Sequence, residues 1–257
     1  MKVNWLCDKI IILGLWGFTV TGLLDLLFPR RCVVCDSVMI GKGDKVCAKC
    51  RAALPVLKGN RCLMCGKEIP EDEEFCSDCL EGGHSFEKVY AIWNYDDAMS
   101  ASIARFKYHG RQEYAQFYAE EILKTYGEVF KETGFDAVIP VPVHGARRAL
   151  RGYNQAELVA KYIAAELNVP LVTDLLIRTV NTKPQKELTP KERAKNLSSA
   201  FGINRKSKSY DIYLEKVLLV DDIYTTGSTA DACSKALIGA GAGSIYVCCM
   251  CVARGSV

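Results

Sequence analysis

Two adjacent carboxylates, Asp221 and Asp222, directly follow the apolar run VLLV at residues 217–220. An apolar run of this length is typical of a buried parallel strand, which is followed by a loop and a helix. In α/β proteins, ligands bind beyond the carboxyl ends of such strands. Two acids at such a place are costly unless cations or hydroxyl groups meet them. The sequence therefore predicts a ligand site at the acidic pair.

A turn rich in hydroxyl groups, TTGST, follows the acidic pair and opens a predicted helix. Backbone amides and hydroxyls at a helix start can cradle a phosphate, and a glycine lets it approach closely. An ordinary helix N-cap would leave the two carboxylates unexplained. A Walker B strand would need a Gly-x-x-x-x-Gly-Lys-Ser/Thr loop, which the sequence lacks. The pattern predicts a ribose 5-phosphate, with its phosphate at Thr225, Thr226, Gly227, Ser228 and Thr229.

Four Cys-x-x-Cys pairs in the first third of the chain form a second group of reactive side chains. Two thiolates two residues apart can hold one side of a tetrahedral zinc ion, and a second pair completes the site. Redox dithiols and an iron–sulfur cluster are the alternatives, but the spacing and the missing thioredoxin-like context favour zinc. The pairs predict structural zinc that replaces a core, whether they combine in sequence or interleave. They are Cys32 with Cys35, Cys47 with Cys50, Cys62 with Cys65, and Cys76 with Cys79.

Three regions with different patterns must position these residues. Residues 1–28 are an apolar leader, 29–85 a small cysteine-rich module, and 86–257 an α/β domain. In the last region, strands are expected near residues 88–95, 136–143, 217–222 and 243–253, and helices near 99–108, 112–131, 154–168 and 228–238. Strands that alternate with helices predict a mostly parallel sheet with flanking helices, whose ligand lies at the carboxyl ends of the strands.

The leader and the charge distribution bear on location. The charge-free run at residues 10–24 is shorter than the ~20 apolar residues of a spanning helix, which favours an interfacial or packed helix over an anchor. A start codon placed too far upstream would also produce such a leader. The missing signal-peptide cleavage pattern and the enzyme-like α/β region favour the reducing cytoplasm, with membrane contact left open. In that compartment, paired cysteines indicate metal rather than disulfides. The net charge of +3 demands no nucleic-acid partner, although residues 178–208 carry nine basic and two acidic residues.

A second loop, HGARRALRGYNQAE at residues 144–157, leaves the predicted strand DAVIPVPV and enters a helix. Its amides could face the same crevice as the acidic pair. The side chains of Arg147, Arg148 and Arg151 could neutralise phosphates, although any one of them could be an exposed arginine with little role. This loop is therefore the expected second wall of the ligand site.

Residues 217–229 match the phosphoribosyl pyrophosphate motif, which consists of four apolar residues, two acids, three variable residues and Thr-Gly-x-Thr. The match resembles the type I phosphoribosyltransferases. RGYNQAE, IPVPVHGARR, FKYHGRQE, FPRRCVVC and TKPQKELTPKERAKNLSSAF occur in the same chain. With these motifs, residues 23–252 resemble the ComF family, competence-associated proteins with a double zinc ribbon and a phosphoribosyltransferase-like domain.

The resemblance implies a role for each part of the site. Asp221 and Asp222 would hold the ribose hydroxyls directly or through magnesium, and the TTGST turn would hold the 5-phosphate. The pyrophosphate would lie at Val143, His144 and Gly145. A basic lid at residues 182–201 would close over the ligand and exclude water from an oxocarbenium-like transition state. Its expected contacts are Lys183, Gln185, Arg193 and Asn196, of which Lys183 and Arg193 join the two aspartates as catalytic residues.

Two functions follow from the resemblance. The first is magnesium-dependent transfer of a phosphoribosyl group to or from a nitrogenous acceptor, in DNA uptake or nucleotide metabolism. The second is a non-catalytic competence factor that contacts single-stranded DNA and competence-machinery proteins and uses the phosphoribosyl pyrophosphate pocket as a sensor. The acceptor has no signature in the sequence, because Tyr108, His109 and Tyr153 are residues of kinds that more often pack.

Overall fold

The computed structural model of the chain describes residues 29–39, 43–179, 200–209 and 214–253. The leader at 1–28 and the predicted lid contacts Lys183, Gln185, Arg193 and Asn196 lie outside these ranges, so their roles stay predictions. Within the described ranges, no helix combines the length and the hydropathy that crossing a membrane requires.

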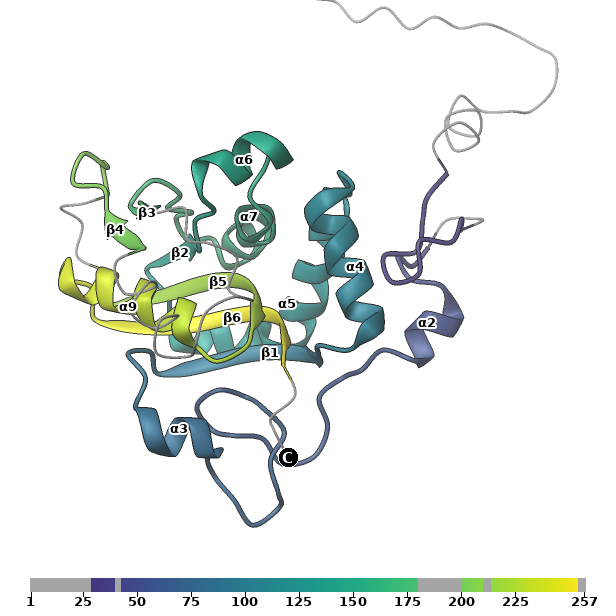
Figure 1. Ribbon diagram of the computed structural model, residues 1–257, viewed down its shortest axis with the longest axis horizontal. Coiled ribbons are helices and arrows are strands. Elements are labelled where there is room, and N and C mark those ends of the chain that lie inside the picture. The colour runs from purple at the N-terminus through teal and green to yellow at the C-terminus, as the bar shows by residue number, and fades with distance from the viewer. Residues whose placement is uncertain (1–28, 40–42, 180–199, 210–213, 254–257) are drawn as a thin grey trace, which may run out of the picture.

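A four-stranded sheet forms the centre of the larger domain (Figure 1). Its strands are β1 (Lys88–Asn94), β6 (Ser244–Val252), β5 (Lys216–Tyr224) and β2 (Ala137–Pro140), in that spatial order. Every neighbouring pair is parallel. The predicted parallel sheet is therefore confirmed, with the strand that carries the acidic pair in its interior.

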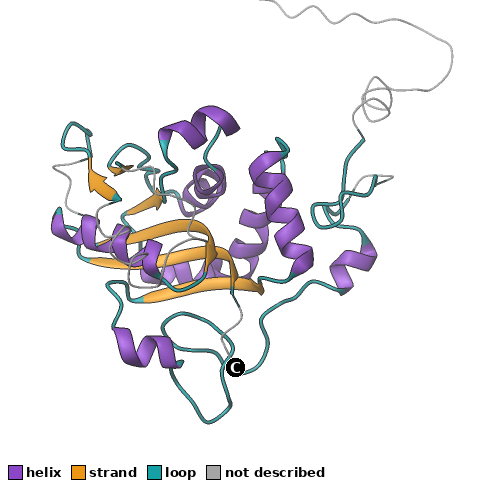
Figure 2. Cartoon of the chain, viewed as in Figure 1, coloured by secondary structure: helices purple, strands orange, loops and turns teal. Residues whose placement is uncertain are grey.

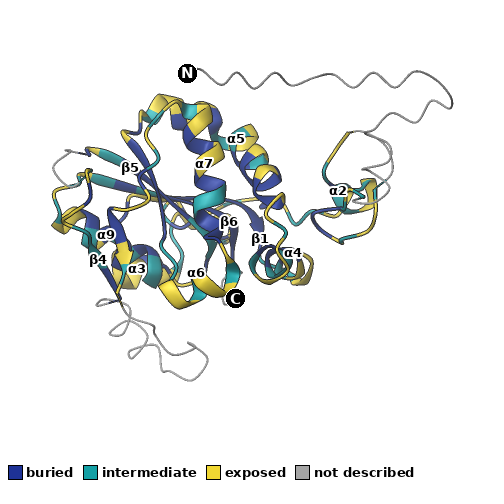
Figure 3. Ribbon diagram, turned by 90° about the horizontal axis from the view of Figure 1, so that it is seen from above, coloured by how far each residue is buried: buried dark blue, intermediate teal, exposed yellow. Residues whose placement is uncertain are grey.

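Both faces of this sheet are buried, which explains why β5 reads as a continuous apolar run. Val217 and Leu219 point into one core cluster, and Leu218 and Val220 point into the other. Figure 2 shows helices on either side of the strands, and Figure 3 shows the strands dark blue between helices with yellow outer surfaces. The period of two along the strand thus divides one run between two cores.

The helices of the larger domain are mostly those expected. In chain order they are α4 (Asp97–Tyr108), α5 (Tyr114–Thr133), α6 (Gly145–Arg151), α7 (Gln155–Leu167) and α9 (Ser228–Gly239). The helices α4, α5 and α7 contribute to the Leu218 cluster, whereas α9 contributes to the Val217 cluster. The additional helix is α6, which occupies what the sequence presented as a loop.

The strand β5 is longer than predicted. It continues through Asp221 and Asp222 to Tyr224, because its pairing with β6 persists to Val252. A short antiparallel pair, β3 (Leu176–Arg178) with β4 (Phe201–Ile203), was not predicted. It brings the backbone amide of Thr179 within 2.9 Å of the carbonyl oxygen of Ala200. The described residues on either side of 180–199, the range that holds most of the predicted lid, are therefore hydrogen-bonded to each other.

The cysteine-rich region contains two similar ribbons. Each has an isolated antiparallel bridge, Arg31 with Val38 and Arg61 with Glu68, followed by a short helix, α2 (Ala48–Ala52) or α3 (Ser77–Gly82). Cys32 and its neighbours in the first ribbon join the Leu218 cluster, whereas the second ribbon joins the Val217 cluster. The ribbons therefore pack into the cores on opposite faces of the sheet.

The edge of the sheet at β1 is covered by the second ribbon and the segment before it. The amide of Leu57 donates to Ile92 O, the amide of Asn94 donates to Pro55 O, and the amide of Val89 donates to Met64 O. These bonds satisfy edge groups that would otherwise be open to another chain. The ribbon module is thus hydrogen-bonded into the larger domain.

Candidate functional site

A cavity of about 400 Å³ lies where β2 and β5 end. This is the carboxyl end of the parallel sheet, where the sequence predicted the ligand. Its wall brings together the acidic pair, part of the TTGST turn and several cations. The lining residues are Tyr95, Lys107, Tyr108, Val141, Pro142, Val143, Arg147, Arg151, Asn154, Gln155, Ala156, Arg178, Asp221, Asp222, Ile223, Thr225 and Thr229.

The two aspartates have different partners. Asp222 Oδ2 lies 2.6 Å from Lys107 Nζ, and each side chain is 18% exposed. Burial lowers the pKa of Lys107, but the Asp222 carboxylate outweighs this and raises it. Lys107 therefore stays charged and compensates one of the two acids. Lys107, which belongs to the FKYHGRQE motif, was assigned no role from the sequence.

Asp221 is less well compensated. Burial, followed by repulsion from Asp222, raises the pKa of Asp221 to about 7. Its Oδ1 accepts a 2.8 Å hydrogen bond from the backbone amide of Asp222. A hydroxyl donor or a divalent cation brought by a ligand would stabilise its ionised form. The acidic pair therefore has capacity for a ligand beyond Lys107.

The TTGST turn connects β5 to α9. Gly227 has a φ of +80° and occupies the N-cap position, so no side chain caps the first amides of α9. These amides are available to an anion at the positive end of a 12-residue helix. Thr225 and Thr229 line the cavity, and Thr226 Oγ1 lies 2.9 Å from Ser228 Oγ. The residues predicted to bind the phosphate thus form one turn, and two of them line the cavity.

The arginines of α6 separate into two kinds. Arg147 and Arg151 line the cavity, whereas Arg148 pairs with Glu157 at 3.2 Å. Arg151 donates through Nη2 to Tyr108 Oη at 3.0 Å, and its guanidinium lies 4.7 Å from the centre of that ring. Its Nη1 donates to Gln155 Oε1 at 3.0 Å. Arg151 is thus held at the cavity wall.

Arg178, at the end of β3, supplies another cation that the sequence did not single out. Burial, followed by the charge of Arg147, lowers the pKa of Arg178. Two cations that approach each other in a partly buried wall favour an anionic ligand. In the sequence this residue was marked only as the first of the basic segment at 178–208.

The three residues predicted to bind the pyrophosphate differ in their placement. Val143 lines the cavity, but His144 caps α6, with its Nδ1 accepting from the amide of Ala146 at 3.2 Å, and Gly145 begins that helix. Nearby, Asn154 caps α7 and donates to Val141 O at 3.0 Å. The loop therefore follows the predicted path, with one of its three predicted residues in the wall.

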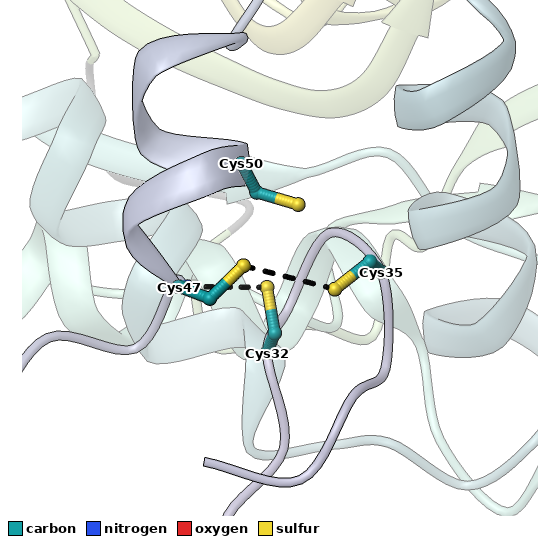
Figure 4. A group of neighbouring side chains, drawn as sticks. All are labelled: Cys32, Cys35, Cys47 and Cys50. Carbon is teal, nitrogen blue, oxygen red and sulfur yellow. Dashed lines mark hydrogen bonds between the residues drawn. The ribbon is translucent and has the colours of Figure 1, made fainter.

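The eight paired cysteines form two groups of four thiols, and the pairs combine in sequence. In each group all sulfur atoms lie within 4.8 Å of one another. Figure 4 shows the first group converging, with Cys35 Sγ 3.9 Å from Cys47 Sγ and the Cys47 amide 3.3 Å from Cys32 Sγ. A tetrahedral zinc–sulfur length of 2.3 Å separates sulfurs by about 3.8 Å, so the donor set fits zinc. The second group contains Cys62, Cys65, Cys76 and Cys79.

Known protein families match both the cysteine-rich region and the α/β domain. The double zinc ribbon family matches residues 23–80, and the phosphoribosyl transferase domain family matches residues 153–256. Competence protein F of Haemophilus influenzae is 29% identical, over 86% of this chain and 96% of that protein. Competence protein ComFC of Bacillus subtilis is 27% identical, over 82% and 89%. The chain is therefore similar over most of its length to competence proteins of the ComF type.

Another similar protein is the DNA utilization protein YhgH of Escherichia coli K12, which is 25% identical over 88% of this chain and 98% of that protein. Among solved structures, adenine phosphoribosyltransferase from Leishmania tarentolae is 15% identical with a TM-score of 0.35, over 67% of this chain and 93% of that one. The fold assignment rests instead on the parallel sheet and the two family matches. The resemblance predicted from the sequence is confirmed, and the two cysteine groups support structural zinc.

Proposed function

We propose that this ComF-type protein binds phosphoribosyl pyrophosphate with Mg²⁺ and transfers the phosphoribosyl group to a nitrogenous acceptor. The observation that carries the proposal is one cavity that joins the acidic pair, the TTGST turn and the cations Lys107, Arg147, Arg151 and Arg178. A ligand with a diol, a phosphate and a separate pyrophosphate matches this distribution of charge.

Each wall of the cavity would take one part of the ligand. Asp221 and Asp222 would accept from the two ribose hydroxyls, and the amides at the start of α9 would bind the 5-phosphate. The cations of α6 and β3 would face the pyrophosphate, beside Val143. This division explains why acids and cations line the same cavity.

The reaction would exchange one bond at the ribose for another. The bond from C1 to the pyrophosphate oxygen breaks, and its electron pair leaves with pyrophosphate. A lone pair on the acceptor nitrogen forms the new C–N bond, and the acceptor loses a proton to solvent. Arg147, Arg151 and Arg178 would stabilise the charge that grows on the leaving oxygen.

Magnesium fits the donor set in one respect. Mg²⁺ prefers carboxylate and phosphate oxygens, and Asp221 has an incompletely compensated carboxylate in the cavity. When bound, the ion would neutralise charge on the departing pyrophosphate. The aspartates would orient the ribose whether they meet its hydroxyls directly or through the ion.

The lid also belongs to this proposal. Lys183 and Arg193 would reach the pyrophosphate from the segment between β3 and β4, and Gln185 and Asn196 would contact the ligand beside them. Support comes from the adjacent ends of the segment at Thr179 and Ala200. Closure would exclude water from the oxocarbenium-like centre.

The wider organisation is proposed on the same basis. Residues 1–28 would be a leader, 29–85 the double zinc ribbon and 86–257 the phosphoribosyltransferase-like domain of a cytoplasmic protein. Membrane contact would depend on the leader alone. Support for the middle boundary comes from the linker at residues 83–87, which separates α3 from β1.

The experiment combines binding and turnover. Full-length, zinc-loaded protein is titrated with phosphoribosyl pyrophosphate in the presence and absence of Mg²⁺, and pyrophosphate release is followed with a panel of nucleobases and other nitrogenous acceptors. A ligand at 100 times its Kd should stabilise the fold by about 2.7 kcal/mol. No stabilisation and no release would contradict the proposal, whereas binding without release would favour the sensor function.

A second candidate, binding of single-stranded DNA in a competence complex, is favoured by one observation. Tyr108 is 62% exposed and carries Arg151 stacked on its ring at the cavity mouth. An exposed aromatic beside arginines is the arrangement on which unpaired bases stack. The relatives named for competence and DNA utilization agree with this candidate. Its test is the affinity for an oligothymidylate, which should fall steeply with salt.

A further inference from the structure

The linker between the second ribbon and β1 lies against the TTGST turn. Its His84 donates from Nδ1 to Asp231 Oδ2 at 2.7 Å, and the backbone amide of Ser85 donates to Asp231 Oδ1 at 2.8 Å. Asp231 belongs to the first turn of α9. Both oxygens of this carboxylate are therefore occupied by two consecutive linker residues, which fixes the linker to the start of the helix.

The imidazole of His84 also supports the turn itself. A Cβ atom at Gly227 would lie 2.8 Å from His84 Cε1 and 2.6 Å from Tyr224 Oη. The turn thus rests directly on these two side chains, on the side of Gly227, whereas Thr225 and Thr229 line the cavity. Any shift of His84 or Tyr224 would change where the amides of α9 meet a ligand.

His84 is itself held firmly. Its side chain is 7% exposed and stacks on Phe86 with a ring separation of 4.6 Å and an interplanar angle of 16°. With the proton on Nδ1, its Nε2 can accept from Tyr224 Oη, 3.4 Å away. An imidazole with two hydrogen-bond partners and a stacked ring has one defined position.

The second ribbon packs against the residues that hold His84. Cys62, Cys65 and Cys79 belong to the same buried cluster as Phe86 and Tyr224. The short helix α3, which contains Cys76's partner Cys79, ends just before the linker. The second cysteine group, His84 and the TTGST turn therefore form one packed series.

We infer that the second zinc ribbon is a positioning element of the ligand site, and that His84 is the residue through which it sets the TTGST turn. The inference rests on the proposed function for the identity of the ligand. It assigns the ribbon a part in binding the 5-phosphate, beyond its structural zinc. The cavity geometry would then depend on a module that contributes no residue to the cavity wall.

The test compares His84→Ala with His84→Asn in the full-length, zinc-loaded protein. Asparagine keeps a donor near the position of Nδ1, so it should recover most of the binding lost in His84→Ala. Affinity for ribose 5-phosphate should fall roughly tenfold in His84→Ala, whereas affinity for inorganic pyrophosphate should stay within about twofold. Lys45→Ala, which removes the contact of the first ribbon with Glu120, is the matched control and should change neither affinity.

Hydrogen exchange separates this inference from the proposed function. Amides at residues 225–231 should exchange faster in His84→Ala than in the wild type, with no ligand present, and those of the first ribbon should be unchanged. If the wild type binds no phosphoribosyl pyrophosphate, the proposed function fails, and the exchange still decides whether His84 sets the turn. Unchanged exchange at the turn, equal losses for both ligands, or loss of zinc from His84→Ala would each overturn the inference.

Discussion

The Nζ atom of Lys107 lies 2.6 Å from Oδ2 of Asp222, which joins the last turn of α4 to the strand that carries the acidic pair. The same helix holds the first ribbon, because Ser102 Oγ donates to Val33 O at 2.5 Å and the Arg105 guanidinium donates to Val34 O. One helix therefore connects the first cysteine group to the candidate site.

Replacing Lys107 by alanine should destabilise the protein, because Asp222 would lose its charged partner in a wall that is largely buried. The expected decrease in the free energy of unfolding is about 1–3 kcal/mol, measured by urea denaturation at pH 8. Lys131→Ala removes an exposed pair with Glu128 and should cost less than about 0.5 kcal/mol. Equal costs for the two variants would show that the Lys107 pair is no stronger than a surface pair.

Asp221→Asn should stabilise the ligand-free protein in a pH-dependent way. Because burial and Asp222 raise the pKa of Asp221 to about 7, the folded state binds its proton more tightly than the unfolded state does. Stability is therefore lost as pH rises from about 4 to 7, and asparagine removes that loss. At pH 8 the variant should be more stable by at most about 4 kcal/mol, and at pH 4 the two proteins should be alike.

The same substitution should abolish binding of phosphoribosyl pyrophosphate, which makes the two effects opposite in sign. Urea denaturation across this pH range and ligand titration at pH 8 measure them separately. Asp72→Asn, at an exposed position of the second ribbon, is the control for loss of a carboxylate. A variant that is less stable than the wild type at pH 8 would contradict the raised pKa of Asp221.

Local pattern was sufficient to predict the sheet, most of its helices and the grouping of the acidic pair with the TTGST turn. The run VLLV, the acids and the turn are consecutive, so one strand and one helix start bring them together. Lys107 and Arg178 were missed because they reach the cavity from α4 and β3, which only tertiary packing places there. The position of the ribbons on opposite faces likewise depends on contacts between segments far apart in the chain.

The helix α6 was missed for a different reason. It is a seven-residue helix without a buried residue, so it has no apolar periodicity to detect. Its C-cap, Gly152, has a φ of +81°, a backbone conformation that favours glycine. The sequence therefore indicated three arginines in a loop. The helical conformation places Arg147 and Arg151 at the cavity and Arg148 beside Glu157.

Removing zinc should unfold both ribbons, because each ribbon is held together by four sulfurs and has little apolar core. Elemental analysis should find two zinc ions per chain, and Cys35→Ser should reduce this to one. Cys248→Ala, at a buried thiol of β6 outside both groups, should keep both ions. Iron in place of zinc, or zinc retained fully in Cys35→Ser, would contradict the assignment.

The two neighbouring arginines of α6 give a matched comparison. Arg151→Ala should weaken binding of pyrophosphate roughly tenfold, because it removes a cation that Tyr108 and Gln155 hold at the cavity wall. Arg148→Ala should change the affinity by less than about twofold, since Arg148 pairs with Glu157 outside the wall. Isothermal titration of both variants decides, and equal losses would mean that charge near α6 matters rather than the placement of Arg151.

Gly227→Ala should damage the TTGST turn by two mechanisms that a second glycine can separate. At Gly227 alanine would suffer both the positive φ of +80° and a Cβ placed 2.6 Å from Tyr224 Oη. At Gly134, which has a φ of +68° and nothing within 4 Å of an added Cβ, alanine would suffer the backbone strain alone.

Gly134→Ala should therefore cost about 1–2 kcal/mol of stability and leave the affinity for ribose 5-phosphate unchanged. Gly227→Ala should cost more and lose that affinity, because the turn must move away from Tyr224 and His84. Thermal denaturation and ligand titration of both variants measure the difference. If the two substitutions have the same cost and Gly227→Ala still binds, the turn tolerates displacement, and the contact of Gly227 with Tyr224 and His84 does not determine its position.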